Sequence, residues 1–335
     1  MDPIKRICKI LKVCKSFAIM GHIKPDADSL ASSFAMASLI RRLGPGRKII
    51  VASTTVVPPH IRFMVGKEKI IAPAVVQDCQ GLECAIFLEC SNKRRAGNIG
   101  YENHFRTTVN IDHHKTSRCF ADVNWIDPKA SSNAEQIYRL YEHLRIKPSV
   151  KESTWLYAGM VSDTGCFQYA LTSAATHRIA AGFLEAGVKH TEIYNRMFAS
   201  KNIGHLKLLA KALNGIKFHV SGKLSCMRLS KRDFLRHAPE PADTDDIVNY
   251  GLSPESVEAT FMFKQEPFRG KGITSVSMRS KGRIDVSEVA RAFNGGGHRN
   301  AAGFEIKNTS MDSIERMIVK QFKKSIEHGR NSKRK

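Results

Sequence analysis

Short apolar runs alternate with longer helix-like stretches along the first half of the chain. The apolar, β-rich runs cover residues 17–20, 48–53, 85–88 and 107–111. Apolar residues recur with helical spacing over residues 29–43, 131–144 and 153–161. The first of these stretches has Asp28 or Ser29 as its expected N-cap and ends at Gly44-Pro45-Gly46. This alternation predicts an α/β fold in which helices cover a doubly wound, mostly parallel sheet.

The pattern changes near residues 195–215, where a lone helical stretch is followed by strand-like alternation over 217–229. Further along, strands are expected at 257–264 and 273–279, and helices at 243–250 and 286–293. We therefore predict two domains, with the ranges 1–195 for the first, 196–215 for a helical linker, 216–330 for a smaller C-terminal α/β domain and 331–335 for a basic tail. The end of the chain, "KKSIEHGRNSKRK", is expected to be solvated and frayed.

Charge and composition narrow the class of protein and its partners. The 53 Lys and Arg residues exceed the 31 Asp and Glu residues, which gives a formal charge of +22 and favours nucleic acid or nucleotide partners. The longest nearly apolar stretch, residues 30–40, is too short to span a membrane, and the first residues lack the pattern of a secretory signal. The eight cysteines form no CxxC pair. We expect a cytoplasmic protein with reduced thiols and no membrane attachment.

Acidic and imidazole side chains follow several of the predicted elements, at the point where each element ends. They are His22, Asp26 and Asp28 after the first strand, Glu89 after "AIFL", Asp112, His113 and His114 at the end of "VNIDHH", and Asp163 after "LYAGMVS". In open α/β sheets the ligand crevice lies beyond the carboxyl ends of the strands. These four segments are therefore expected to converge there.

Unpaired carboxylates at such density would repel one another and their pKa values would rise. Because the motifs hold few lysines or arginines, divalent metal ions are the expected counter-charge. Imidazole and carboxylate ligands suit Mn²⁺, Fe²⁺, Co²⁺, Zn²⁺ or Mg²⁺, and the absence of thiolate pairs argues against a structural zinc cage. Two ions about 3.5 to 4 Å apart would clamp a phosphoryl group for in-line attack.

Taken together, the motifs resemble those of the DHH phosphoesterase family, in the branch that carries a DHHA1 domain. They are "HIKPDAD" at 22–28, "DHH" at 112–114, "SDTG" around Asp163 and "GGGHRNAAG" at 295–303. The resemblance extends to the bifunctional oligoribonuclease and PAP phosphatase branch. It implies an active site in the cleft between the two domains and two divalent metal ions, commonly Mn²⁺, with Mg²⁺ or Co²⁺ as alternatives.

The resemblance also implies a role for individual residues. The metal ligands would be His22 and Asp26 for one ion, Asp28, His113 and Asp163 for the other, and Glu89 between them. His114 would donate to the substrate phosphate or the leaving group, and Asp112 would orient an imidazole. The residues implied in substrate binding are Asn92 and Arg95 in the first domain and Arg279, Ser280, Gly296, Gly297 and His298 in the second, with Gly295–Gly297 forming an anion-binding nest.

One departure from the family pattern bears on activity. Glu89 stands where the family has an aspartate, so the bridging carboxylate is one methylene longer. The expected function is hydrolysis of short oligoribonucleotides to mononucleotides, of the 3′-phosphate of adenosine 3′,5′-bisphosphate (PAP), or of both. The alternatives are a phosphodiesterase for linear or cyclic dinucleotides, an exonuclease on longer single strands, and a nucleotide-binding protein whose catalysis Glu89 has weakened. Assembly as a homodimer is left open.

Overall fold

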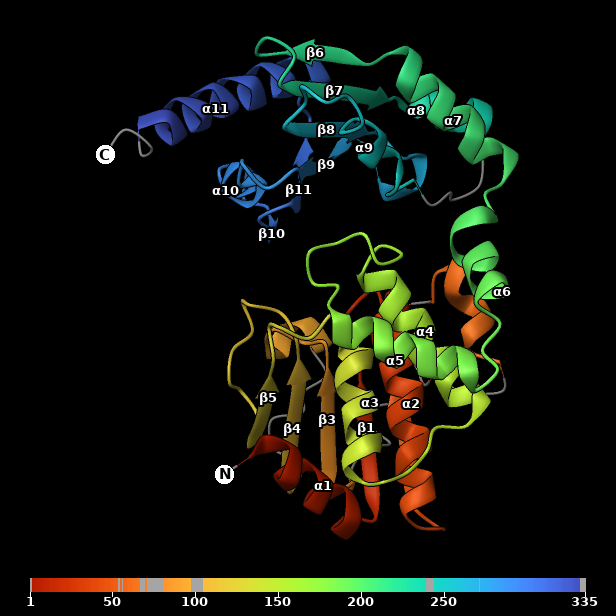
Figure 1. Ribbon diagram of the computed structural model, residues 1–335. Coiled ribbons are helices and arrows are strands. Elements are labelled where there is room, and N and C mark those ends of the chain that lie inside the picture. The colour runs from red at the N-terminus through yellow and green to blue at the C-terminus, as the bar shows by residue number, and fades with distance from the viewer. Residues whose placement is uncertain are drawn as a thin grey trace. The chain divides into compact units, whose positions relative to one another are not determined.

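The computed structural model describes residues 2–53, 55, 57–66, 70, 81–97, 105–238, 244–270 and 272–331. The chain divides into two compact units, Met1–Ser200 and Lys201–Lys335. Each unit contains its own sheet (Figure 1). Among the described residues, no helix is both long enough and apolar enough to cross a membrane.

The described strands of the first unit form a sheet with parallel pairs throughout, where the sequence predicted a mostly parallel one. Its strands are β1 (Ser16–Met20), β2 (Lys48–Ala52), β3 (Cys84–Leu88), β4 (Thr107–Asp112) and β5 (Val123–Ile126). Their order is β2-β1-β3-β4-β5, so the chain changes direction across the sheet between β1 and β3. A doubly wound sheet of this order has its ligand crevice at that switch point. The fold class predicted from the sequence is confirmed, although β5 was not anticipated.

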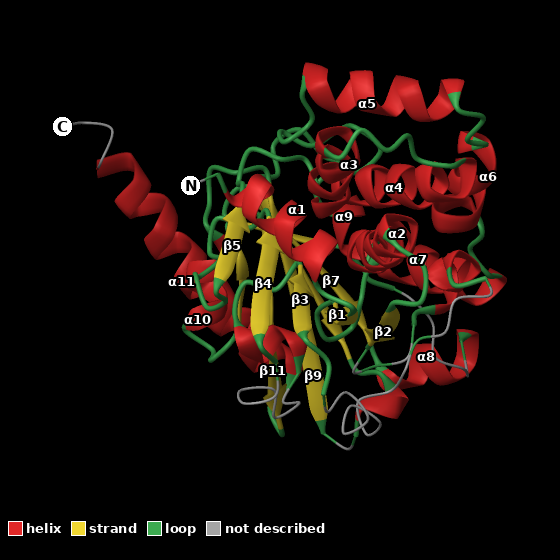
Figure 2. Cartoon of the chain, turned by 90° about the horizontal axis from the view of Figure 1, so that it is seen from below, coloured by secondary structure: helices red, strands yellow, loops and turns green. Residues whose placement is uncertain are grey.

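Helices pack against one face of this sheet. They include α1 (Pro3–Val13), α2 (Ala27–Leu43), α3 (Asn133–His143) and α4 (Val150–Asp163), with α5 (Ala174–Glu185) and α6 (His190–Tyr194) following in the chain. α2, α3 and α4 contact one another, and α5 lies on the outer side of α4 (Figure 2). The core beneath them includes the fully buried Phe17 and Phe34, with Trp155 at 5.4 Å from the Phe34 ring. The opposite face carries a smaller apolar cluster around Met20 and Phe87.

The start of α2 differs from the prediction. Asp26, and neither Asp28 nor Ser29, is the N-cap, because its Oδ1 accepts the Ser29 N–H at 2.9 Å. The helix therefore begins at Ala27, two residues earlier than expected. As a consequence Asp28 lies in the first turn, where its side chain is fully buried beneath the neighbouring helices.

The second unit has a mixed six-stranded sheet of order β10-β11-β9-β8-β7-β6. Its strands are β6 (Lys217–His219), β7 (Leu224–Leu229), β8 (Ala259–Lys264), β9 (Ile273–Ser280), β10 (Gly296–His298) and β11 (Ala301–Lys307). Its helices are α7 (Ile203–Asn214), α8 (Lys231–His237), α9 (Ile247–Tyr250), α10 (Val286–Arg291) and α11 (Met311–Asn331). Only the β7–β8 pair is parallel among these described strands.

Three helices of this unit, α7, α9 and α11, differ from the prediction. The stretch expected to be a linker forms α7, whose Leu208 and Ala212 lie in the core of the second unit. The helix expected at 243–250 is shorter, since α9 begins at Ile247, and residue 243 lies outside the described residues. The end of the chain was expected to fray, but its backbone is helical up to Asn331. Ile314, Ile318 and Phe322 recur at helical spacing and anchor α11 on the sheet.

Candidate metal centre

The predicted metal ligands lie at the carboxyl-terminal edge of the first sheet. His22 follows β1, Glu89 follows β3, His113 follows β4, and Asp163 is the last residue of α4. Glu89 and His22 thus flank the switch point between β1 and β3. Parallel strands deliver their carboxyl ends to one edge, so segments far apart in the sequence meet here.

Glu89 lies between two imidazoles. Its Oε2 is 3.6 Å from His22 Nε2, and its Oε1 is 3.8 Å from His113 Nε2. Ligand atoms of His22, Asp26 and Glu89 lie within 4.8 Å of one another, and so do those of Asp28, Glu89, His113 and Asp163. The two groups share Glu89, so all six side chains converge around one bridging carboxylate.

The other contacts in the cluster are short. Asp26 Oδ2 lies 3.3 Å from His22 Nε2, and Asp163 Oδ2 lies 3.0 Å from His113 Nε2. The His113–Asp163 pair lacks the alignment of a hydrogen bond, and both ring nitrogens of His113 as well as Glu89 Oε2 are buried without a hydrogen-bond partner. Buried carboxylate oxygens and imidazole nitrogens that lie this close without hydrogen bonds fit a shared cation as their common partner.

Glu89 adopts an unusual backbone conformation. Its φ is 60°, in the left-handed region that non-glycine residues rarely occupy. Its N–H donates to the Ile111 carbonyl at 3.0 Å, which continues the β3–β4 pairing to this residue. Such a conformation costs about 1 to 3 kcal/mol and persists where the surroundings enforce it. At Glu89 this backbone conformation occurs where the side chain lies between His22, which follows β1, and His113, which follows β4.

Asp28 is held by the start of α3. Its Oδ2 accepts the Asn133 N–H at 2.6 Å and its Oδ1 accepts the Ala134 N–H at 2.8 Å. These two N–H groups belong to the first turn of the helix, where a negative charge is stabilised. Gly159 of α4 allows the close approach, since a Cβ there would lie 2.7 Å from Asp28 Oδ1. Both helices were predicted, but the support that they give to Asp28 was not, because backbone N–H groups and a glycine have no ligand-type side chain that would signal the role.

The electrostatics of the cluster favour a cation. Burial raises the pKa of Glu89, and the charges of Asp26 and Asp28 raise it further. Burial and the charge of Asp163 likewise raise the pKa of Asp28. Burial alone would lower the pKa of His113, but the adjacent Asp163 and Glu89 raise it to about 12. Buried carboxylates and imidazoles with unpartnered donor atoms fit divalent ions, for which oxygen and nitrogen ligands are preferred.

Asp112 fixes the orientation of His114. Its Oδ1 lies 2.7 Å from His114 Nδ1 and also accepts the His114 backbone N–H at 3.2 Å. Burial alone would raise the pKa of Asp112, but the hydrogen bond and charge of His114 lower it. A carboxylate on Nδ1 holds a proton there and fixes the orientation of the ring. The His113 and His114 rings lie in contact at 4.8 Å between centroids, so His114 borders the metal-ligand cluster.

Asn92 and Arg95 lie in the segment after Glu89. Asn92 caps the short helix η3 (Lys93–Ala96), and its Oδ1 accepts the Arg95 N–H at 3.2 Å. The Arg95 carbonyl accepts the Ile23 N–H at 2.7 Å, which ties this segment to the loop that carries His22. The Arg95 side chain is exposed. The Asn92 side chain therefore caps a helix, and substrate binding by Asn92 and Arg95 stays a prediction.

The predicted substrate residues of the second unit lie on β9 and β10, two strands that β11 separates. Arg279 on β9 pairs with Ala301 on β11, and the Ser280 hydroxyl donates to the Ile284 carbonyl at 2.7 Å. The Ser280 hydroxyl is thus engaged as a donor within the unit, and its contact with a substrate stays a prediction.

The glycine motif does not form the expected nest. Gly296–His298 form strand β10, which pairs with β11, and only Gly297 of the described motif glycines has a positive φ, of 140°. A Cβ on Gly297 would lie 2.5 Å from the Ala301 carbonyl oxygen, so close strand packing explains this glycine. The side chain of His298 lies outside the described residues.

Comparison with known proteins agrees with these motifs. The model of the DHH family N-terminal domain matches residues 16–160, and that of the DHHA1 domain matches residues 233–327. The bifunctional oligoribonuclease and PAP phosphatase NrnA of Thermus thermophilus is 26% identical over 331 residues, which cover 97% of this chain and 95% of the relative. The cyclic-di-AMP phosphodiesterase PdeA of Listeria monocytogenes is 24% identical over 90% of this chain but only 46% of its own length.

Among solved structures, an exopolyphosphatase-related protein from Bacteroides fragilis has the same fold. Its TM-score is 0.86 at 21% sequence identity, with 96% of each chain covered. At this level of identity the likeness establishes the fold alone.

Proposed function

Because this chain belongs to the DHH phosphoesterase family and carries a DHHA1 domain, we propose that it hydrolyses short oligoribonucleotides to mononucleotides and removes the 3′-phosphate of PAP. We propose Mn²⁺ as the ion that supports both reactions, with Mg²⁺ or Co²⁺ as substitutes. A cytoplasmic location is part of the same proposal.

The observation that carries the proposal is the position of Glu89 between His22 and His113. One carboxylate within 3.6 Å and 3.8 Å of two imidazoles, with Asp26 on one side and Asp163 on the other, has the layout of a bridged pair of cation sites. Divalent ions bound there would polarise the phosphoryl group and neutralise its charge.

The residues of the chain have distinct tasks in this scheme. Asp28 is held rigidly by the α3 N-terminus and supplies a fixed carboxylate to the cluster. In its imidazolium form His114, which Asp112 orients through Nδ1 at 2.7 Å, donates the Nε2 proton to a phosphate oxygen or to the leaving oxygen. The burial of Glu89 and His113 keeps water away from the charged groups and strengthens their interactions.

The test is turnover by the purified protein with single defined substrates. A labelled RNA trimer and PAP, each incubated with Mn²⁺, should yield mononucleotides and adenosine monophosphate. Asp163→Asn keeps the size of the side chain but removes a charge from the cluster, and should lower turnover by 100-fold or more. Folded wild-type protein without activity on either substrate, in any of Mn²⁺, Mg²⁺ or Co²⁺, would refute the proposal.

Dinucleotides are the second candidate substrates, favoured by the likeness to a cyclic-di-AMP phosphodiesterase. Linear pApA and cyclic di-AMP should be compared with the RNA trimer at equal concentration. A kcat/KM for cyclic di-AMP that exceeds the value for the trimer would favour the second candidate.

The substitution Glu89→Asp tests the alternative that Glu89 has weakened catalysis. Asp accepts positive φ more readily than Glu, so Glu89→Asp relieves backbone strain while shortening the carboxylate. If the wild-type protein is active, Glu89→Asp should change turnover by less than about tenfold, because a carboxylate remains at the bridging position. A wild-type protein that is inactive until Glu89 is replaced by Asp would show that Glu89 had disabled the site.

A further inference from the structure

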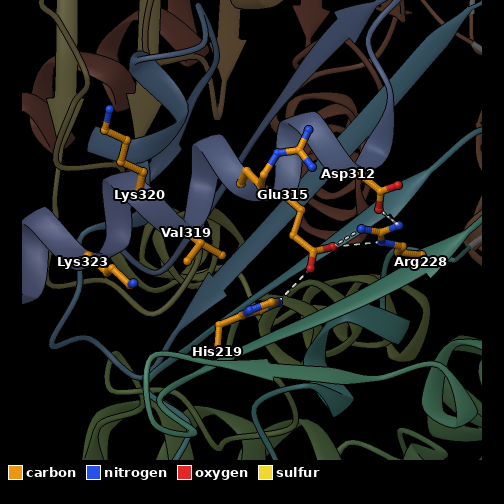
Figure 3. Close-up of a pocket in the computed structure, with 8 residues that line it drawn as sticks. His219, Arg228, Asp312, Glu315, Val319, Lys320 and Lys323 are labelled. Atoms are coloured by element: carbon orange, nitrogen blue, oxygen red, sulfur yellow. Dashed lines mark hydrogen bonds and ion pairs between the residues drawn. The ribbon is translucent and has the colours of Figure 1, made fainter.

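A cavity lined mainly by charged residues lies on the second unit, between α11 and strands β6 and β7 (Figure 3). Its volume is about 380 Å³. β6 and β7 lie at one edge of the six-stranded sheet, whereas β10, with the glycine motif, lies at the opposite edge. The cavity is therefore separate from the substrate residues predicted for this domain.

Ion pairs hold the floor of this cavity together. Glu315 Oε1 lies 2.9 Å from His219 Nε2, and Glu315 Oε2 accepts from the guanidinium of Arg228, with the Nε contact at 3.0 Å (Figure 3). Arg228 Nη1 also pairs with Asp312 Oδ1 at 2.6 Å. Both carboxylates of the cavity are thus occupied by Arg228 and His219, which lowers their repulsion of an incoming anion.

The helix side of the cavity carries three further cations. Arg316, Lys320 and Lys323 line it at i, i+4 and i+7 of α11, on the exposed side away from the buried Ile314 and Ile318. Arg316 donates to the Ser313 hydroxyl at 3.2 Å. Within the described part of the chain, none of the three lies within ion-pair distance of a carboxylate.

The lining favours phosphate over other ligands. Four Lys and Arg side chains face two carboxylates, an excess of two positive charges, and Val319 is the one aliphatic residue of the lining. Apart from His219 the described lining has no aromatic ring on which a base could stack, so the nucleobases are not the recognised part.

A metal ion is a poorer fit at this floor. Ligand atoms of His219, Cys226 and Glu315 do lie within 4.8 Å of one another. However, the Arg228 guanidinium already occupies Glu315 and would be forced beside a second cation.

We propose that the α11 cavity binds the phosphodiester backbone of single-stranded RNA, without regard to sequence. The choice of RNA over other polyanions rests on the proposed function, whereas the choice of a phosphate-bearing strand rests on the cavity itself. Contacts at i, i+4 and i+7 place three positive charges along about 10 Å of helix, a span that covers successive phosphates of an extended strand.

Binding of a fluorescent 12-nucleotide RNA to the full chain in EDTA tests this without any turnover. The variant Arg316→Gln/Lys320→Gln/Lys323→Gln keeps helix-forming side chains and removes three charges. For single strands each neutralised phosphate adds about 0.7 to the salt slope, so the slope should fall by about 2 and the Kd at about 0.1 M salt should rise on the order of 100-fold.

A matched control exists in the first unit. Lys5, Lys9 and Lys12 lie exposed on α1 at the same i, i+4, i+7 spacing, so their replacement by Gln removes the same charge from the same pattern. This control should leave the Kd within about threefold, and both triple variants should hydrolyse a dinucleotide at the wild-type rate. Equal loss in the two variants, or no loss in the α11 variant, overturns the proposal. A wild-type protein that binds RNA through α11 but hydrolyses none refutes the proposed function and leaves this inference standing.

Discussion

Gly159→Ala should destabilise the first unit although alanine is the better helix former. Gly159 lies in the middle of α4, where this helix crosses α2 and α3. A Cβ at this position would lie 2.7 Å from Asp28 Oδ1, 2.8 Å from Ala134 Cβ and 3.1 Å from Ala31 Cβ. All three neighbours are buried and two are methyl groups fixed to helix backbones, so the helices themselves must move.

The expected magnitude is a balance of two terms. Replacing Gly by Ala inside a helix gains about 1 kcal/mol, whereas overpacking a close-packed core costs about 1 to 3 kcal/mol. Three contacts shorter than ordinary van der Waals distances put the cost at the upper end, so a net loss of about 1 to 2 kcal/mol is expected. Displacing Asp28 from the α3 N-terminus should also weaken Mn²⁺ binding by about tenfold, as loss of supporting contacts around metal ligands does.

Urea unfolding followed by tryptophan fluorescence measures the first term. Both tryptophans of the chain, Trp125 and Trp155, belong to the first unit, so the signal reports that unit alone. Gly182→Ala on α5 is the matched control, because a Cβ there meets nothing within 4 Å and should stabilise by about 0.5 to 1 kcal/mol. If Gly159→Ala is as stable as Gly182→Ala and binds Mn²⁺ like the wild type, the packing argument is wrong.

Three further predictions concern charge in the cluster. Asp112→Asn should lower kcat by about 10- to 100-fold with little change in Mn²⁺ affinity, because it disturbs the His114 proton but no ligand; an unchanged kcat would contradict the role of Asp112. Mn²⁺ binding near pH 7 should release protons, because Glu89 has a raised pKa and ligands must be deprotonated to bind. The Mn²⁺ affinity should therefore fall as the pH falls. Calorimetry in buffers of different ionisation enthalpy measures the proton release, and the absence of any release would contradict this prediction. In the metal-free protein the folded state raises the pKa values of Glu89 and Asp28, so stability is lost as the pH rises above about 4.5. The Tm of the metal-free protein should therefore be higher near pH 5.5 than near pH 7.5. A Tm that does not change with pH would contradict this prediction.

Much of the first unit follows from local patterns in the sequence. The central strands β1 and β3 are buried on both faces and are almost continuously apolar in sequence, which is typical of a parallel sheet. Because parallel strands end at one edge, the sequence alone also predicted that His22, Glu89 and His113 would meet. The residue type identifies a side chain as a possible metal ligand, and its position at the end of a strand indicates where it lies in the fold.

Other features depend on contacts between distant segments, which no local pattern encodes. The N–H groups that hold Asp28 come from Asn133 and Ala134, more than a hundred positions along the chain, and a backbone N–H has no residue-type signature. The need for glycine at position 159 arises only where three helices cross. The α11 cavity likewise joins Arg228 to Glu315, whose pairing is set by the strand order of the second sheet. The sequence by itself predicted which side chains form the cluster, whereas tertiary packing decided what holds them in place, because burial and distance are properties of the folded chain as a whole.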